Sequence, residues 1–195
     1  MAASATTDTA VILAGGKSRR LGRDKAAVEL AGQAMLARMV SLARCVCPNV
    51  FISGRDPAPL VTDVPWFLDE APGLGPLGGI ITALERFQRA CLILSCDLPL
   101  LDEATLRTLL AAWRLRPEGS VMTTFEQAET GFIEALVAVY EPQAALLLRR
   151  ANEEGCRKLS RAIPAAFRHT VVYSVRQGRP FFNVNTPADL AQIIP

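Results

Sequence analysis

Short apolar runs alternate with segments of helical periodicity along almost the whole chain, and this pattern restricts the fold more than any other feature. Strand-like runs lie at residues 10–14, 50–54, 66–70, 91–97, 120–126, 132–140 and 171–175. Apolar residues at helical spacing mark residues 33–46, 80–90, 102–116 and 143–154, a short stretch near 157–163, and a segment after Thr186. This alternation predicts a three-layer α/β fold, in which helices cover both faces of a mostly parallel sheet.

The length of 195 residues fits one domain that buries roughly 70% of the surface its unfolded chain exposes. We find no internal repeat, linker or shift in composition, so we expect a flexible N-terminus at 1–8 and a single domain at 9–195. The opening MAASATTDT lacks the basic and apolar regions of a signal peptide. No apolar stretch approaches the ~20 residues that span a bilayer, and we expect a cytoplasmic protein without membrane contact.

Composition excludes several classes of function. The net charge of +2 and a pI near 8.4 are too mild for a dedicated nucleic-acid binder. Five cysteines without a C-x-x-C pair and a single histidine, His169, support neither a zinc site nor a disulfide framework. Nucleophilic catalysis by a serine or cysteine would depend on His169, which has no carboxylate beside it.

The segment AVILAGGKSRRLGRDK, residues 10–25, contains Gly-Gly-Lys-Ser directly after an apolar strand. A phosphate-binding P-loop of the G-x-x-x-x-G-K-[ST] type would need its first glycine at position 11, which is Val11. A G-x-G-x-x-G dinucleotide fingerprint also fails, because Gly15 and Gly16 are adjacent and Gly22 is too distant. The loop is therefore of neither type.

Cationic side chains are dense in this loop: Lys17, Arg19, Arg20, Arg23 and Lys25. Arginine offers a bidentate fork to phosphate oxygens and lysine a compact charge, while glycines allow close approach of the backbone. Ligands bind at the carboxyl ends of the strands in such sheets, where this loop lies. Its density of positive charge suits a triphosphate. A solvated basic loop is the alternative.

LAGGKSRRLGRDK resembles the signature L-A-G-G-x-S-x-R-x-G-x-D-K of the molybdenum cofactor guanylyltransferases, within the Rossmann-like nucleotidyltransferases of the nucleotide-diphospho-sugar transferase type. Three further segments are similar to family segments in the same order: 69–80, 94–101 and 182–190. The resemblance thus extends over nearly the whole chain, and Gly15 and Asp24 favour the guanylyl branch over relatives that read L-A-A-G.

Asp97 closes an apolar strand, so its carboxylate is expected at the ligand edge of the sheet, where a hard oxygen ligand suits Mg²⁺. The resemblance implies that Asp97 binds the metal and takes part in catalysis. It likewise implies that Lys25 neutralises the triphosphate and that Arg20 is the arginine of the S-x-R-x-G segment. A turn or helix-capping aspartate is the simpler alternative for Asp97.

The resemblance also implies a nucleotide pocket in which Asp69 and a glycine-rich turn face the base and ribose. Asp69 could accept hydrogen bonds from the N1 and N2 edge of guanine, although the turn could equally serve only to connect a strand to a helix. The positions implied to bind nucleotide are Leu13, Ala14, Gly15, Gly16, Lys25, Asp69, Gly75, Pro76, Leu77 and Asp97.

Asn183 and Asn185 in FNVNTPADL carry amides suited to phosphate, pterin or the metal shell, and we expect at least one to contact the acceptor. Thr186 and Pro187 also predict a helix start, with a capping threonine and proline at the first position. This motif therefore has a structural role in either case.

The chain departs from the family pattern at two places. Relatives commonly carry a proline where Ala135 precedes Leu136, often with a histidine upstream, and this region is expected to line the acceptor side. Some members place an asparagine on the second strand near the base, where this chain offers Ser53 and Arg55. The acceptor is therefore less strongly indicated than the nucleotide chemistry.

The resemblance implies an Mg²⁺-dependent transfer of GMP from GTP to the terminal phosphate of molybdenum-loaded molybdopterin, with release of pyrophosphate. Alternatives are cytidylyl transfer to the same pterin, nucleotidyl transfer to another acceptor, and a non-catalytic nucleotide-binding module. The resemblance leaves open transient contacts with proteins that deliver or receive the cofactor.

Overall fold

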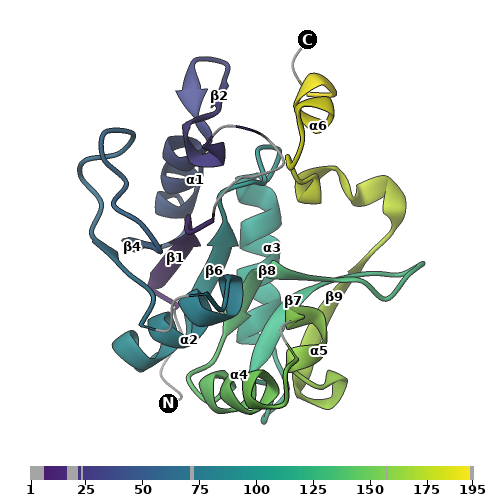
Figure 1. Cartoon of the computed structure of the whole chain (residues 1–195). Helices are drawn as coiled ribbons and strands as arrows, with labels where there is room; N and C mark the ends of the chain where they lie inside the picture. The colour runs from purple at the N-terminus through teal and green to yellow at the C-terminus, as the bar shows by residue number, and fades with distance from the viewer. Residues whose placement is uncertain (1–6, 17–21, 23, 71–72, 157, 194–195) are drawn as a thin grey trace.

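The computed structural model describes residues 7–16, 22, 24–70, 73–156 and 158–193, and shows a seven-stranded sheet between layers of helices (Figure 1). The order across the sheet is β5-β4-β1-β6-β8-β7-β9. The strands are β1 Thr9–Leu13, β4 Asn49–Ser53, β5 Trp66–Phe67, β6 Cys91–Ser95, β7 Met122–Gln127, β8 Ile133–Tyr140 and β9 Arg168–Tyr173. A separate hairpin joins β2 Glu29–Leu30 to β3 Gln33–Ala34.

The prediction of a mostly parallel sheet is confirmed, with one exception. Strands β5, β4, β1 and β6 pair in parallel, as do β7 and β9. Strand β8 runs antiparallel to both of its neighbours, β6 and β7. A tight turn joins β7 to β8, and such a hairpin places consecutive strands antiparallel.

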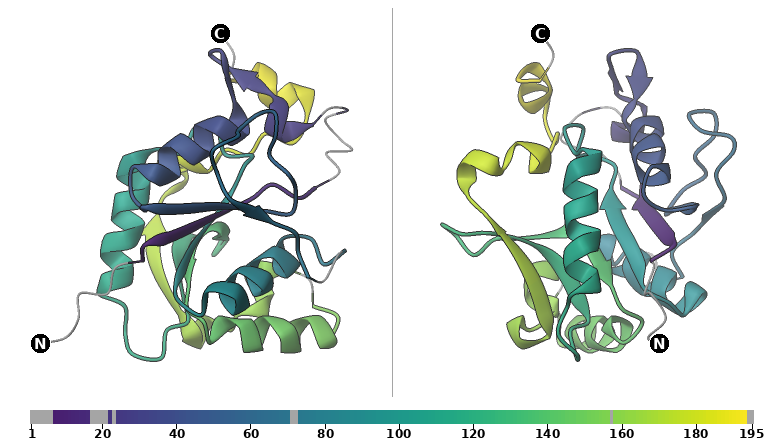
Figure 2. Two further views of the ribbon diagram at one scale, coloured as in Figure 1. Left: turned by 90° about the vertical axis from the view of Figure 1, so that its left-hand side faces the viewer. Right: turned by 180° about the vertical axis from the view of Figure 1, so that it is seen from behind.

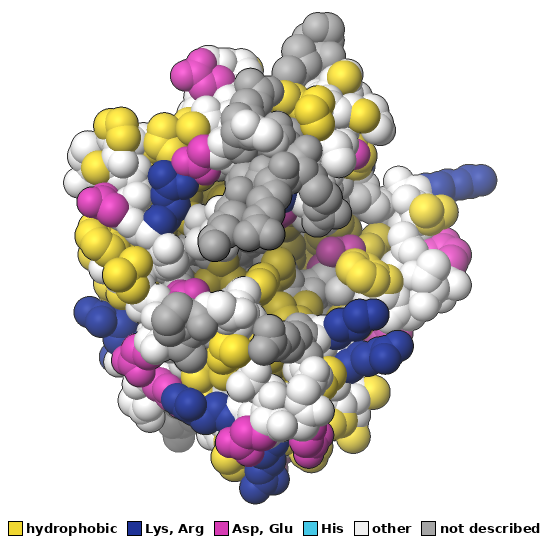
Figure 3. Space-filling view, in the orientation of Figure 1, with side chains coloured by type: hydrophobic (Ala, Val, Ile, Leu, Met, Phe, Trp, Pro, Cys, Tyr) yellow, Lys and Arg dark blue, Asp and Glu magenta, His cyan; other side chains and the backbone are white. Residues whose placement is uncertain are grey.

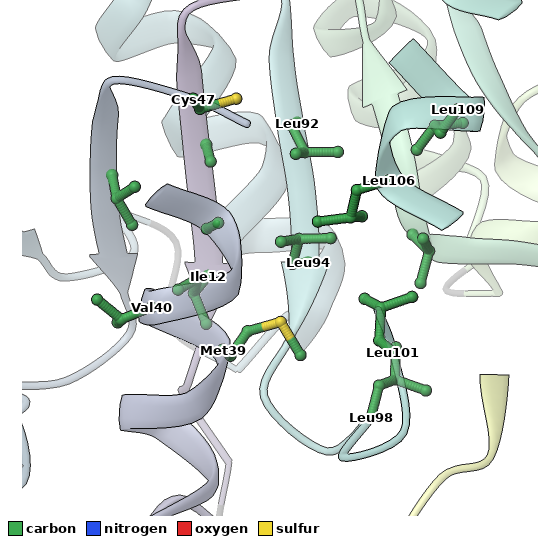
Figure 4. Packing of buried hydrophobic residues seen from close by; sticks show 14 of the residues in the cluster. Ile12, Met39, Val40, Cys47, Leu92, Leu94, Leu98, Leu101, Leu106 and Leu109 are labelled. Atoms are coloured by element: carbon green, nitrogen blue, oxygen red, sulfur yellow. The ribbon is translucent and has the colours of Figure 1, made fainter. Parts of the chain in front are cut away.

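Helices cover both faces of the sheet, as expected (Figure 2). Helices α1 Met35–Arg44 and α3 Glu103–Arg114 pack on one face, while α2 Pro76–Phe87, α4 Ala144–Glu153 and α5 Leu159–Ala162 pack on the other. Alternate residues of β1 face the two helix layers. Ile12 faces the α1 and α3 side, where it packs with Met39 and Leu94 (Figure 4). Val11 belongs to the cluster on the α2 side. A last short helix, α6, spans Pro187–Ala191.

Two helix starts differ from the expected boundaries because glycine-rich turns decide them. The helix expected at 33–46 begins only at Met35, since Ala31 and Gly32 have positive φ and reverse the chain into the β2–β3 hairpin. The helix expected at 80–90 begins earlier, at Pro76, after Gly75 with φ 61°. Proline at the first position of a helix loses no intrahelical hydrogen bond.

The helix caps predicted from the sequence are confirmed. The Asp102 side chain accepts a hydrogen bond from the Thr105 amide at 2.8 Å and opens α3. Thr186 caps α6 reciprocally with Asp189, and Pro187 occupies the first turn. The third strand, expected at 66–70, is shorter: β5 ends at Phe67, and Asp69 lies beyond it.

Thr7, the first described residue, is buried and donates a hydrogen bond from its hydroxyl to the Ala90 carbonyl at 2.9 Å. Within the described ranges, no helix combines the length and apolar character needed to cross a membrane.

The loops after β1 and β4 approach each other so closely that both need glycine. A Cβ on Gly54 would lie 2.6 Å from the Gly15 Cα, and Gly54 also has φ +95°. Neither the space nor the backbone conformation suits a side chain. The close approach places the Gly15–Gly16 backbone beside the carboxyl end of β4.

We expect Gly54→Ala to lower the free energy of unfolding by more than about 3 kcal/mol, since strain at positive φ adds to a backbone clash. Gly119→Ala is the matched control, because Gly119 has φ +84° with no atom within 4 Å of the added Cβ. It should lose only about 1 to 2 kcal/mol. Urea denaturation of both variants measures the difference, and equal losses would contradict the role of the Gly15 contact.

Candidate active site

A cavity of about 240 Å³ lies at the carboxyl ends of β1 and β6. Figure 3 shows this side of the molecule, which is hollowed near its centre with hydrophobic side chains along the floor. Residues from segments far apart in the sequence line the cavity: Leu13, Ala14, Gly15, Gly16, Asp24, Lys25, Ala26, Pro76, Ser95, Cys96, Asp97, Leu136 and Asn185. Eight of the residues expected at the site are in this lining.

Lys25 joins the predicted metal ligand to the C-terminal segment. Its Nζ lies 3.2 Å from Asp97 Oδ2 and also donates a hydrogen bond to Asn185 Oδ1. The side chains of Lys25 and Asp97 are only 18% and 16% exposed, so their interaction is weakly screened by solvent. The structure thus brings together three residues that the sequence places 72 and 160 positions apart.

Neighbouring polar groups hold Asp97 in place. The Ser95 hydroxyl donates to Asp97 Oδ1 at 2.5 Å, while Oδ2 faces Lys25. The backbone carbonyl of Asp97 accepts from the Val184 amide at 3.0 Å. Because Val184 is buried in a small cluster with Val28 and Met35, this hydrogen bond anchors the segment that carries Asn183 and Asn185.

Asp189 orients Asn185 from the first turn of α6. Its Oδ2 accepts from the backbone amides of Asn185 at 2.9 Å and Thr186 at 2.8 Å. These hydrogen bonds stabilise the carboxylate and hold the pKa of Asp189 below its usual range. The capping role expected for this motif therefore also positions Asn185 at the cavity, whereas Asn183 lines an adjacent hollow.

Asp24 positions Lys25 and was not singled out as a site residue from the sequence. Its Oδ1 accepts from the Ala26 amide at 3.1 Å and caps the short helix Lys25–Ala27, and its Oδ2 pairs with Arg55. Arg55 lies on the loop after β4, so this ion pair ties the Lys25 segment to that loop. The signal in the sequence was the aspartate before the lysine of the motif.

Asp69 lies beside a different group of residues, at the ends of β4 and α2. The Ser53 hydroxyl donates to Asp69 Oδ1 at 2.6 Å. A Cβ on Gly79 would lie 3.0 Å from Ser53 Oγ and 3.3 Å from Asp69 Oδ1, so the first turn of α2 packs closely here. Asp69 is half-buried and does not line the 240 Å³ cavity.

The glycine-rich turn contributes unequally to the site. Pro76 lines the cavity, and Gly75 provides the positive φ that starts α2. Leu77 is only 1% exposed, belongs to the core under α2 and does not line the cavity. Arg20, with the other loop cations Lys17, Arg19 and Arg23, lies outside the described residues.

Cys96 lines the cavity and packs against the core, and its thiol is not activated. Burial raises its pKa to about 12, and the adjacent Asp97 carboxylate adds to the rise more than Lys25 opposes it. A thiol with this pKa is almost entirely protonated at neutral pH. Nucleophilic catalysis by Cys96 is therefore disfavoured, and the cavity relies on charge and hydrogen bonding.

Comparison with known proteins assigns the family. Residues 10–170 match the MobA-like NTP transferase domain. The chain belongs to this family. It is a nucleotidyltransferase of the molybdenum cofactor guanylyltransferase type. The resemblance read from the four sequence segments is thus confirmed.

Individual MobA-like relatives match over nearly the whole chain. A protein of Chloroflexus aggregans named "Probable molybdenum cofactor guanylyltransferase" is 33% identical over 92% of this chain and 90% of its own length. The molybdenum cofactor biosynthesis bifunctional protein of Synechocystis is 32% identical over 94% of this chain, which spans only 52% of that longer protein. The crystal structure of molybdopterin-guanine dinucleotide biosynthesis protein A from Archaeoglobus fulgidus matches with a TM-score of 0.76 and 25% identity, over 95% of this chain and 96% of that chain.

The donor groups of this MobA-like cavity are oxygen atoms of the kind that would suit Mg²⁺. Among the described residues, no three His, Cys, Asp or Glu side chains cluster as a multidentate metal site. The cavity lining holds two carboxylates: Asp24, which is engaged by the Ala26 amide and Arg55, and Asp97, which accepts from the Ser95 hydroxyl and lies beside Lys25. One available carboxylate at the cavity would suit Mg²⁺, which commonly takes one or two protein carboxylates together with water and substrate phosphate oxygens.

We expect Cys96 to resist alkylation in the folded MobA-like domain at pH 8, although it lines an open cavity, because its raised pKa leaves little thiolate. The exposed Cys45 should react first. Iodoacetamide labelling followed by peptide mass spectrometry measures both rates. Labelling in urea is the control, in which both thiols should react. Comparable alkylation rates of Cys96 and Cys45 in the folded protein would contradict the raised pKa of Cys96.

Proposed function

We propose that this chain transfers GMP from GTP to the terminal phosphate of molybdenum-loaded molybdopterin, forming a guanine dinucleotide cofactor and pyrophosphate with the help of Mg²⁺. The observation that carries the proposal is the convergence of Lys25, Asp97 and Asn185 at the end of the parallel strands. The names of the matched relatives support the guanylyl and pterin assignments.

The reaction requires alignment and neutralisation of charge rather than a covalent enzyme intermediate. An oxygen of the acceptor phosphate attacks the α-phosphorus of GTP, the bond from the α-phosphorus to the bridging oxygen breaks, and pyrophosphate leaves with the electron pair. The backbone of Gly15 and Gly16 can approach the phosphates closely, because neither residue carries a side chain. The ammonium group of Lys25, which contacts both Asp97 and Asn185, would neutralise negative charge on the phosphates.

Asp97 would hold Mg²⁺, with Ser95 fixing the orientation of its carboxylate. The bound ion supplies Lewis-acid stabilisation of charge on the phosphate oxygens. Lys25 lies beside the same carboxylate, so its ammonium group would add positive charge near the phosphates that the ion holds. Asn185, held from behind by Asp189, is placed to contact the acceptor or the metal shell.

Guanine recognition is assigned to the neighbourhood of Asp69. Ser53 occupies one carboxyl oxygen of Asp69 and thereby fixes the orientation of the side chain. A carboxylate held this way can accept hydrogen bonds from the N1 and N2 donors of guanine, which cytosine does not present in the same pattern. Gly79 packs directly against this group, because a Cβ there would lie 3.3 Å from Asp69 Oδ1.

Asp97→Asn and Lys25→Ala should each reduce nucleotidyl transfer by at least roughly a hundredfold, because each removes charge that stabilises the transition state. Pyrophosphate release from GTP with Mg²⁺ and molybdenum-loaded molybdopterin measures the rate, and circular dichroism checks the fold. Asp63→Asn is the control, since Asp63 forms only an exposed ion pair with Arg44. Near-normal rates for both site variants would refute the assignment.

We expect GTP to outcompete CTP and ATP as the donor in the wild-type protein, and Asp69→Asn to weaken this preference about tenfold or more, since charged hydrogen bonds to the base would be lost. Competition among the three nucleotides, with product analysis by mass spectrometry, measures it. A preference for CTP would move the chain to the cytidylyl branch. If no product forms from GTP, CTP or ATP, the proposed transfer is refuted.

A further inference from the structure

A second hollow of about 340 Å³ adjoins the nucleotide cavity, and the two share Pro76 and Leu136 in their walls. Its lining includes Asn183, one of the two asparagines expected from the sequence to contact the acceptor. The remaining wall comes largely from the first half of β8, where this chain departs from the family pattern. The hollow is therefore placed to receive the part of the acceptor that lies beyond its reacting phosphate.

An irregular stretch of β8 forms this wall. Between the pairs Thr124–Ala138 and Glu126–Ile133, β7 advances two residues while β8 advances five, so residues 134–137 bulge from the ladder. The pairing of β8 with β6 also stops at the pair Leu94–Val137, which leaves residues 133–136 unpaired with β6. Bulges re-aim side chains and occur often beside active sites.

Glu134 lies in this bulge and is a buried carboxyl group that the proposed transfer does not use. It is 8% exposed, lines the hollow, and its Oε1 accepts a hydrogen bond from the Tyr173 hydroxyl at 2.6 Å. Within the described part of the chain, Oε2 has no hydrogen-bond partner. Thr123 Oγ1 is the only side-chain oxygen or nitrogen there that is both fully buried and without a partner, so Oε2 is not fully buried. Oε2 therefore retains access to the hollow.

The surroundings favour a defined orientation of this carboxyl group. Tyr173 packs against Phe125 and Phe181, with ring centroids 6.4 and 4.6 Å away, so its hydroxyl is rigidly placed. Burial raises the pKa of Glu134, and the hydrogen bond from Tyr173 opposes this rise by stabilising the carboxylate. A buried carboxyl oxygen that faces a hollow without a partner favours a ligand that donates hydrogen bonds.

We propose that Glu134 is a specificity residue for the acceptor, and that its carboxyl group accepts hydrogen bonds from the N–H edge of a 2-amino-4-oxo fused heterocycle seated in this hollow. The proposal rests on the proposed function and deepens it. Tyr173 is the positioning residue that directs the carboxyl group. The apolar walls suit the faces of a planar ring, and Phe132, 55% exposed, supplies an aromatic surface in the lining.

A matched pair of ligands tests the inference on the full chain. The first, 6-hydroxymethylpterin, carries the 2-amino donor, and the second, 6-hydroxymethyllumazine, replaces it with a carbonyl oxygen that would repel the carboxylate. Binding of both is measured by ligand fluorescence for the wild type, Glu134→Gln, Tyr173→Phe and the control Glu153→Gln, on the exposed surface of α4. GTP binding and thermal unfolding are measured for the same proteins.

The wild type and Glu153→Gln should prefer the pterin about tenfold, the strength expected of a hydrogen bond to a charged group. Glu134→Gln should lose this preference and Tyr173→Phe should reduce it, while both keep wild-type GTP affinity. An unchanged preference in Glu134→Gln, or none in the wild type, overturns the inference, and leaves Glu134 and Tyr173 as a buried structural pair. If Glu134→Gln fails to fold, an undiminished preference in a folded Tyr173→Phe overturns it.

Failure of the proposed function gives a different result. In that case the wild type would release no pyrophosphate from GTP, whatever its preference between the two heterocycles. A pterin preference that depends on Glu134 would then still support the binding role of the hollow.

Discussion

The fold depends on the complete burial of β1 at the centre of the sheet. Every residue from Thr9 to Leu13 is buried, so all of its backbone polar groups need hydrogen bonds within the protein. Parallel pairing with β4 on one side and β6 on the other supplies them. Because these strands run in the same direction, their carboxyl ends meet at one edge, and each chain segment that leaves them begins beside the same cavity.

Polar interactions at this edge then join distant parts of the chain. The loop after β1 leads to Lys25, β6 leads to Asp97, and the C-terminal segment contributes Asn185. Burial of these groups makes their pairing effective, since charges removed from water are weakly screened. Glycines at 15, 54 and 79 allow the backbone to approach this closely. The sheet thus provides a rigid support, and the chemistry lies in the connections.

The antiparallel strand β8 separates the two sides of the site. A uniformly parallel ladder would continue the regular pairing along β6, whereas β8 bulges at 134–137 and is unpaired with β6 at 133–136. The space that this leaves is the hollow beside the nucleotide cavity. The proposed nucleotide side therefore lies at the regular part of the sheet, and the proposed acceptor side lies at the β8 bulge.

The sequence by itself predicted the layered α/β fold, the caps at Asp102 and Thr186 and the family, because hydrophobic periodicity, capping and contiguous motifs are local properties of the chain. It also indicated Lys25, Asp97 and Asn185, since each follows a recognisable segment. Its strand and helix limits were less accurate where turns decide them, as at Gly32 and Gly75.

Only the tertiary structure decided which of these residues meet. The contacts of Lys25 with Asp97 and Asn185 span 72 and 160 positions, and the Asp24–Arg55 and Glu134–Tyr173 pairs join segments 31 and 39 positions apart. Such contacts depend on strand order and register, which no local pattern specifies. A carboxylate such as Glu134 is therefore ordinary in the sequence, and its burial beside a hollow becomes visible only when the sheet is assembled.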